Sequence, residues 1–146
     1  MILAATFDKF PDLRVLLAHS GGTIPFLAGR LDSCVAHDPA VRTRLKHEPS
    51  WYLKKLYYDG VGYHGPALKL ARELVGADRI MFGYILSDGR SNGRTDNPFF
   101  PPLTGDPNVV EWDSVVTNVE AAKEAFTEDE LVGVMGQNAI EIFGLN

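Results

Sequence analysis

Three short apolar runs, each with a helical pattern later in the chain, constrain the fold most. They cover residues 14–19, 56–59 and 79–83, and the first has the character of a strand buried on both faces. Pro25 and Pro66 are placed to begin the helices that follow the first two runs. Strands that alternate with helices predict an α/β fold with parallel strands. Three strands cannot close a barrel, so the strand count indicates part of a domain.

The other helices are predicted from apolar spacing and from residues that suit helix ends. Gly76 is placed to end the helix that Pro66 begins, and Gly144 to end a last helix at 137–143. Thr127 and Glu130 have the spacing of a capping box. The first residues, from Ile2 to Phe10, predict an amphipathic helix, with further helical patches at 41–45 and 50–55. One more helical stripe consists of Trp112, Val115, Val116, Val119, Ala122 and Phe126.

Composition excludes several functional classes. The chain has 146 residues with 14 basic and 19 acidic side chains, a net charge of −5, which argues against a nucleic-acid-binding surface. No apolar run approaches the roughly 20 residues of a membrane span. Cys34 is the only cysteine, and the first residues lack the basic start of a signal peptide. We expect a cytoplasmic chain that binds neither nucleic acid nor membrane.

Candidate reactive residues follow the predicted strands. His19 and Asp59 end the first two runs and Asp96 follows the third, and parallel α/β folds gather reactive groups at the carboxyl ends of strands. Each residue also has a structural interpretation. A histidine after an apolar run is more often structural, and Asp59 before glycine and Asp96 before Asn-Pro both suit turns. Residues 19–23 could hold an anion, but they lack the pattern of a P-loop or a dinucleotide site.

Taken together and in order, five motifs are more specific than any one residue. They are Phe10–Val15, Ala18–Gly22 with Pro25 and Arg30, Tyr57–Asp59, Val75–Gly83 and Thr95–Pro102. This order resembles the amidohydrolase superfamily, in the aminocarboxymuconate-semialdehyde decarboxylase branch and closest to isoorotate decarboxylase-like members. The resemblance implies that residues 1–146 are one domain, truncated at its amino terminus. It would form about three strands from the carboxyl-terminal part of a distorted (β/α)8 TIM barrel, with helices on one side.

The resemblance also implies a site. His19 matches an acid/base histidine, Asp96 a metal ligand, and Phe99 an aromatic contact to the substrate ring. Arg30 matches an arginine that holds a substrate carboxylate in a neighbouring subunit, which implies a homodimer. The implied cofactor is a divalent metal, zinc in most members. A carboxylate suits such an ion, an imidazole can donate a proton, and a guanidinium suits a carboxylate.

The chain departs from the family pattern in two places. The His-x-His motif of the first strand and the histidine of the fifth are absent, and the spare histidines His37, His47 and His64 lie outside matching motifs. Residues 84–94 separate Phe82-Gly83 from Thr95-Asp96, and we interpret this segment as an inserted, projecting loop. Asp88 in this loop is a less favoured candidate for the metal-binding acid.

The function expected from the resemblance is a metal-dependent decarboxylase of a small aromatic, heteroaromatic or muconate-type carboxylic acid. Two alternatives stay open at this point. One is a metal-dependent hydrolase of the same superfamily, and the other is an inactive fragment that serves as an interaction module. Because most of the family's metal ligands are missing, we expect the 146-residue chain alone to bind zinc poorly.

Overall fold

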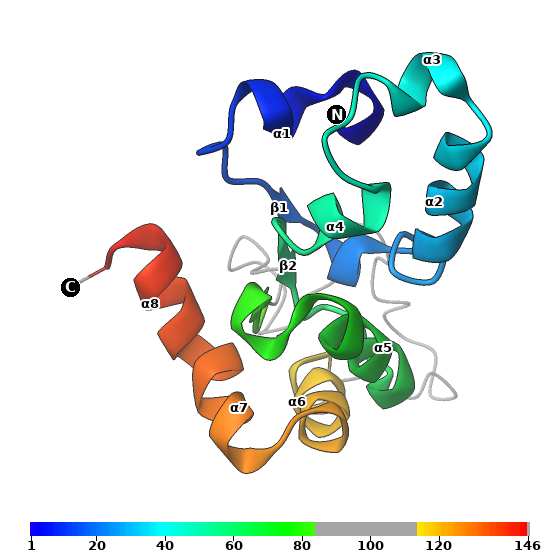
Figure 1. Cartoon of the computed structure of the whole chain (residues 1–146). Coiled ribbons are helices and arrows are strands. Elements are labelled where there is room, and N and C mark those ends of the chain that lie inside the picture. The colour runs from blue at the N-terminus through cyan, green and yellow to red at the C-terminus, as the bar shows by residue number, and fades with distance from the viewer. Residues whose placement is uncertain (84–113, 146) are drawn as a thin grey trace, which may run out of the picture.

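A parallel sheet of three short strands lies at the centre of the structure (Figure 1). The structure is a computed structural model that describes residues 1–83 and 114–145. Strands β1 (Leu16–Leu17), β2 (Tyr57–Asp59) and β3 (Ile80–Met81) are ordered β1-β2-β3, and both neighbouring pairs are parallel. The three predicted strands and their parallel pairing are therefore confirmed, although each observed strand is shorter than the apolar run that contains it.

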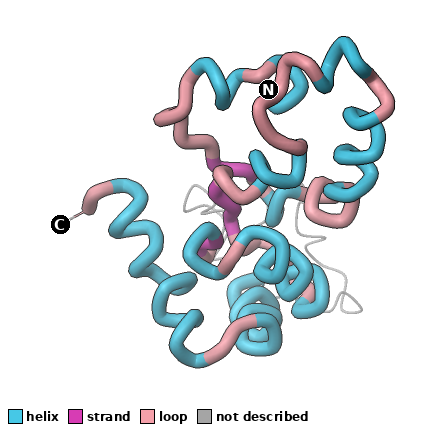
Figure 2. Tube along the Cα trace, viewed as in Figure 1, coloured by secondary structure: helices cyan, strands magenta, loops and turns pink. Residues whose placement is uncertain are grey.

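Helices make up most of the described chain outside the sheet, as Figure 2 shows. Between the amino terminus and β2 the helical elements are η1 (Ile2–Ala4), α1 (Thr6–Lys9), η2 (His19–Gly21), α2 (Ala28–Ala36), α3 (Pro39–Arg42) and α4 (Pro49–Leu53). Helix α5 (Gly65–Val75) and η3 (Ala77–Arg79) connect β2 to β3. The last elements are α6 (Ser114–Ala125), α7 (Glu128–Val132), the π-helical turn η4 (Gly133–Gln137) and α8 (Asn138–Phe143).

The strand register places one row of side chains under the helices. Leu17 pairs with Tyr58 and Tyr58 with Ile80, so these three side chains share one face of the sheet, and Tyr58 and Ile80 are fully buried. Leu16 faces the other way and is 48% exposed. The expectation that the first strand is buried on both faces is therefore wrong. Within the described residues, the Leu16 side chain on the second face of β1 is only about half covered. Strand β1 is also an edge strand of this sheet.

Helices α5 and α6 lie side by side and form much of the core with β2 (Figure 1). Leu68 and Ala71 of α5 meet small residues of α6, and the buried residues of α6 and its end are Asn118, Ala121, Ala122, Ala125 and Phe126. The predicted helical stripe is correct for Ala122 and Phe126 but wrong for Val116, which is 56% exposed, and its first residue, Trp112, lies outside the described residues. A polar residue, Asn118, occupies the buried face instead, because it hydrogen-bonds to backbone groups there.

Several predicted helix ends are confirmed. Thr127 accepts a hydrogen bond from the Glu130 amide while Glu130 accepts one from the Thr127 amide, so the capping box is present. The Arg72 guanidinium lies 2.9 Å from Glu130 and connects α5 to α7. The Thr127 amide bond, together with Arg72, holds the pKa of Glu130 below its usual value. Gly144 ends α8 in the left-handed conformation.

One predicted helix is interrupted and one predicted helix start is wrong. The opening helix is broken at Ala5, whose φ of 54° separates η1 from α1 and allows both Ala5 and Phe7 to be buried in the core. Pro25 does not begin a helix, since residues 23–27 form turns and α2 starts only at Ala28. Pro25 is instead buried beside Gly21, in a tight turn after β1 that apolar spacing alone does not indicate.

Candidate functional site

The turn after β1 has an unusual backbone. His19, Ser20, Gly21 and Gly22 all have positive φ, at 55°, 53°, 78° and 59°. Side chains other than glycine rarely adopt this region, so the first two residues are strained. Gly21 is also required by space, because a Cβ atom there would lie 2.8 Å from Cε1 of Tyr58. The turn therefore lies directly on the buried ring of β2.

Asp59 joins this turn to the loop after β2. Its Oδ1 accepts hydrogen bonds from the Ser20 amide and the Val61 amide, both at 3.1 Å, and its carbonyl accepts one from the Ser20 hydroxyl at 3.2 Å. The carboxylate thus satisfies backbone amides of two loops, which supports the interpretation of Asp59 as a structural turn residue. The consequence is a fixed position for the residue that precedes Ser20, His19.

Asn118 of α6 holds the loop after β2 and the loop after β3 together. Its Oδ1 accepts hydrogen bonds from the amides of Gly62 at 3.3 Å and Tyr63 at 3.1 Å, and its Nδ2 donates to the Gly83 carbonyl at 3.3 Å. Gly62 follows β2 and Gly83 follows β3. One fully buried amide therefore connects the loops at the carboxyl ends of two strands. Apolar spacing missed Asn118, although it lies three and four residues before the buried Ala121 and Ala122.

The buried ring of Tyr58 supports the turn after β1 that carries His19. Its hydroxyl donates a hydrogen bond to the Leu53 carbonyl at 2.8 Å, and burial raises the pKa of Tyr58 to about 12. The ring is therefore neutral at physiological pH and belongs to the core on which the His19 turn rests.

A cavity of about 450 Å³ opens beside these loops at the carboxyl ends of β1 and β2. Its walls come from the turn after β1, the loop after β2 and helix α5, and the lining residues are His19, Ser20, Gly22, Thr23, Pro25, Phe26, Val61, Gly62, Ala67 and Leu70. Phe26 is 79% exposed and Leu70 is also exposed. This lining contains no Lys, Arg, Asp or Glu, so within the described residues the cavity is an apolar recess with one imidazole at its rim.

The structure brings only one of the four predicted site residues to this cavity. His19 lines it and is exposed, whereas Arg30 lies on the exposed surface of α2 and is not part of its lining. Asp96 and Phe99 lie outside the described residues, as do Asp88 and the whole 84–94 segment. The approach of His19 to Asp96 therefore stays a prediction.

The described residues do not form a metal site. Among residues 1–83 and 114–145, no group of three His, Cys, Asp or Glu side chains is placed to hold an ion. The three spare histidines have local settings: His37 contacts the Ser33 carbonyl, His47 stacks on Trp51, and His64 precedes α5 as an exposed N-cap. Any metal bound here needs donors from elsewhere.

Comparison with known proteins decides the family. The sequence pattern of the amidohydrolase family matches residues 1–145. The chain belongs to the amidohydrolase family. It is 30% identical over 154 aligned residues to 2-amino-3-carboxymuconate-6-semialdehyde decarboxylase from Dictyostelium discoideum, an alignment that covers 100% of this chain and 35% of that protein. The resemblance on which the site residues were chosen is thus confirmed at the level of family and branch.

Solved structures of this amidohydrolase family share the fold. The apo structure of IDCase, an isoorotate decarboxylase, from Metarhizium anisopliae is 41% identical with a TM-score of 0.76, over 98% of this chain and 37% of that one. The 5-carboxyvanillate decarboxylase LigW from Sphingomonas paucimobilis is 27% identical with a TM-score of 0.72, over 100% of this chain and 38% of that one. The three strands are thus part of the amidohydrolase TIM barrel.

The amidohydrolase chain spans little more than a third of the length of these relatives. A more distant structure of the same fold, a dihydroxybenzoic acid decarboxylase from Polaromonas sp. JS666, is 22% identical and holds manganese and an inhibitor. In the described part of this chain, none of the helices has the length and apolar character to cross a membrane.

Proposed function

We propose that this chain forms part of a metal-dependent decarboxylase that acts on a small aromatic, heteroaromatic or muconate-type carboxylic acid. Three decarboxylases among its relatives support the proposal, at 41%, 30% and 27% identity. The observation that carries it is the position of His19, an exposed imidazole fixed by a strained turn at the rim of an apolar recess. This recess lies at the strand ends where barrel enzymes place their chemistry.

His19 supplies the proton that decarboxylation requires. When the bond between the ring carbon and the carboxylate breaks, carbon dioxide leaves and the electron pair stays on the ring carbon. The imidazolium of His19 donates its proton to that carbon, a C–H bond forms, and the neutral imidazole regains a proton from solvent. Its exposure favours this last step, because bulk water reaches the ring.

The recess suits the ring of such a substrate, and Arg30 suits its carboxylate. Pro25, Phe26 and Val61 offer apolar surface to an aromatic ring, but the part of the lining that the described residues supply holds no Lys or Arg to pair with a carboxylate. Arg30 is exposed on α2, as a residue that reaches the site of a second copy must be. In this proposal Arg30 anchors the carboxylate across a homodimer and Phe99 contacts the ring.

A divalent metal is part of the proposal, but the described residues do not fit it as a ligand set. Asp96 is the position that matches the family's last metal ligand, and the remaining donors have to come from sequence beyond the described residues. The ion is zinc, as in most members, or manganese, which is bound in the Polaromonas relative. When bound, it would polarise a substrate oxygen.

A fusion protein tests the proposal. The chain, with and without residues 84–94, is joined to the part of Metarhizium IDCase that it does not match, and carbon dioxide release from isoorotate is measured with added zinc or manganese. We expect no release from the 146-residue chain alone and turnover by the fusion that lacks residues 84–94. Turnover by the bare chain would show that its metal ligands lie elsewhere.

Matched variants of the active fusion assign the residues. His19→Asn should lower turnover by roughly 10²–10⁴-fold, the range of general acid catalysis. His37→Asn, at the exposed C-cap of α2, should leave turnover unchanged. Asp96→Asn should lower the metal content measured by elemental analysis, with Asp129→Asn, at an exposed position on α7, as the control. Equal activity of the His19 and His37 variants would contradict the assignment, and a fusion that binds metal without turnover would favour the inactive module.

A further inference from the structure

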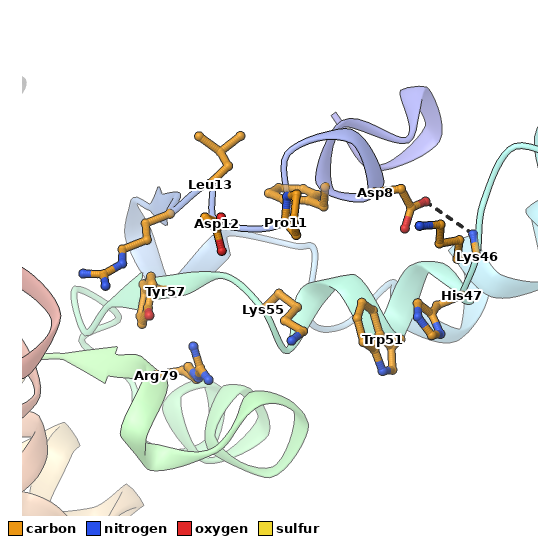
Figure 3. Close-up of a pocket in the computed structure, with 12 residues that line it drawn as sticks. Asp8, Pro11, Asp12, Leu13, Lys46, His47, Trp51, Lys55, Tyr57 and Arg79 are labelled. Carbon is orange, nitrogen blue, oxygen red and sulfur yellow. Dashed lines mark hydrogen bonds between the residues drawn. The ribbon is translucent and has the colours of Figure 1, made fainter.

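A second cavity, of about 440 Å³, lies at the opposite end of the sheet (Figure 3). It is bounded by the loop before β1, the residues before α4, helix α4 itself, the first residue of β2 and the last residue before β3. Its volume is within the range of about 300–1,000 Å³ that small-molecule sites occupy. The proposed decarboxylase site uses none of its residues.

The cavity is cationic in a chain that is otherwise acidic. Its lining holds four cationic side chains, Arg14, Lys46, Lys55 and Arg79, against two carboxylates, while the whole chain has a net charge of −5. One of the carboxylates, Asp8, already accepts hydrogen bonds from the Tyr52 hydroxyl at 2.6 Å and the Lys46 amide at 3.3 Å. These bonds, that from Tyr52 above all, hold the pKa of Asp8 below its usual value, so Asp8 stays ionised, and the four cations of the lining exceed its two carboxylates by two.

Aromatic rings position two of the cations without neutralising them. The Lys55 ammonium lies 4.9 Å from the centre of the Trp51 ring, and the Arg79 guanidinium lies 5.1 Å from the centre of the Tyr57 ring. His47 stacks on Trp51 at 3.7 Å and so fixes the first of these rings. Figure 3 shows Lys55 and Arg79 pointing toward the same space between α4 and the residues before β3. Both charges are thus held in place before any ligand arrives.

The guanidinium groups keep donors available. Arg79 pairs through Nε with the exposed Asp78 at 3.2 Å, and Arg14 donates through one Nη to the Ile142 carbonyl. Each guanidinium carries five N–H donors, so among residues 1–83 and 114–145 these contacts orient the group and engage only a minority of its donors. Forked guanidinium donors combined with lysine point charges are the donor set that phosphate groups prefer.

We propose that this cavity binds a small phosphorylated compound, as a ligand site separate from the catalytic end of the sheet. Pyrophosphate is the probe, because it presents two phosphate groups to the cations and fits the volume. Binding to the full chain is measured by isothermal titration calorimetry, and the indole N–H resonance of Trp51 by NMR reports whether the ligand enters this cavity.

Lys55→Gln tests the site against a close control. Lys54 is the neighbouring residue at the end of α4, is also exposed, and does not line the cavity, so Lys54→Gln removes the same charge outside it. We expect Lys55→Gln to weaken pyrophosphate binding by about tenfold or more, as loss of one charge-assisted contact implies, and Lys54→Gln to leave it unchanged. Lys46→Gln is the second variant inside the cavity and should weaken binding in the same way.

Three results would overturn the proposal. The first is no heat of binding and no Trp51 shift at millimolar pyrophosphate. The second is equal weakening by Lys54→Gln and Lys55→Gln, which would show general charge attraction. The third is citrate binding as tightly as pyrophosphate, because a tricarboxylate that competes equally would contradict selectivity for phosphate. Thermal unfolding followed by circular dichroism confirms that each variant is folded.

Discussion

Replacement of Asn118 by leucine should destabilise the chain by about 3 kcal/mol. The side chain is 0% exposed and bonds three backbone groups, the amides of Gly62 and Tyr63 and the carbonyl of Gly83. A buried polar group that loses its partner costs about 1–3 kcal/mol. Gly62, Tyr63 and Gly83 are only partly buried, so water can replace some of the loss, and the lower end of that range applies to each.

The assay is urea unfolding followed by circular dichroism, with Val116→Ala as the control on the same helix. Val116 is exposed, so its truncation should change the free energy of unfolding by no more than about 0.5 kcal/mol. Amide hydrogen exchange should also accelerate at Gly62 and Tyr63 in the leucine variant. A loss below about 1 kcal/mol would refute the reasoning, since it would mean that these backbone groups need no side-chain partner.

Asn118→Asp separates the acceptor from the donor. An aspartate keeps the oxygen that faces Gly62 and Tyr63 but sets a second oxygen against the Gly83 carbonyl, and burial also disfavours its charge. Its pKa in the folded chain should therefore rise above about 3.9, the unfolded value. A raised pKa means that the variant is closest to the wild type at low pH and loses stability as pH rises through the folded value. Stability independent of pH between 4 and 7 would contradict this account.

Three further predictions use the same unfolding assay. Because burial raises the pKa of Tyr58 to about 12, the stability that Tyr58 contributes should be complete below about pH 10 and should fall as pH rises toward 12. Tyr58→Phe should reduce that fall. The pKa of Glu130 is lowered, so the stability that Glu130 contributes should be lost as pH falls through its pKa in the folded chain. Glu130→Gln should cost about 1 kcal/mol by weakening the cap with Thr127, and it should reduce the loss of stability at acid pH. Gly21→Ala should cost about 2 kcal/mol or more, whereas Gly22→Ala, with open space at its Cβ, should cost only about 1 kcal/mol; equal losses would remove the Tyr58 contact as the cause.

Local patterns in the sequence predicted the features that local interactions decide. The capping box at Thr127 and Glu130 involves residues three apart, and Gly144 ends α8 because glycine adopts positive φ at little steric cost. The strands were found because short apolar runs between helices suit parallel sheets. Their exact extents differ, since pairing depends on a neighbour far along the chain.

Features that depend on distant contacts could not be predicted in this way. The break at Ala5 places Phe7 against Tyr52, which is 45 residues further along the chain. Asn118 is buried because loops after β2 and β3 need its amide, and a helical spacing rule reads such a position as polar surface. For the candidate site, the family resemblance located His19, but the turn that holds it depends on Asp59 of another strand.

The left-handed backbone at His19 makes opposite demands on stability and on the proposed proton donation at a single residue. Glycine would adopt the φ of 55° at His19 without the steric cost that a side chain adds, a cost of about 1 kcal/mol or more. His19→Gly should therefore yield a chain that is more resistant to urea, provided that the imidazole makes no stabilising contact of its own. A library of variants ranked by stability would enrich glycine here, and one ranked by decarboxylation in the fusion protein would retain histidine. Opposite outcomes of the two selections at one position would mark His19 as a residue kept for its reactivity at the expense of the fold.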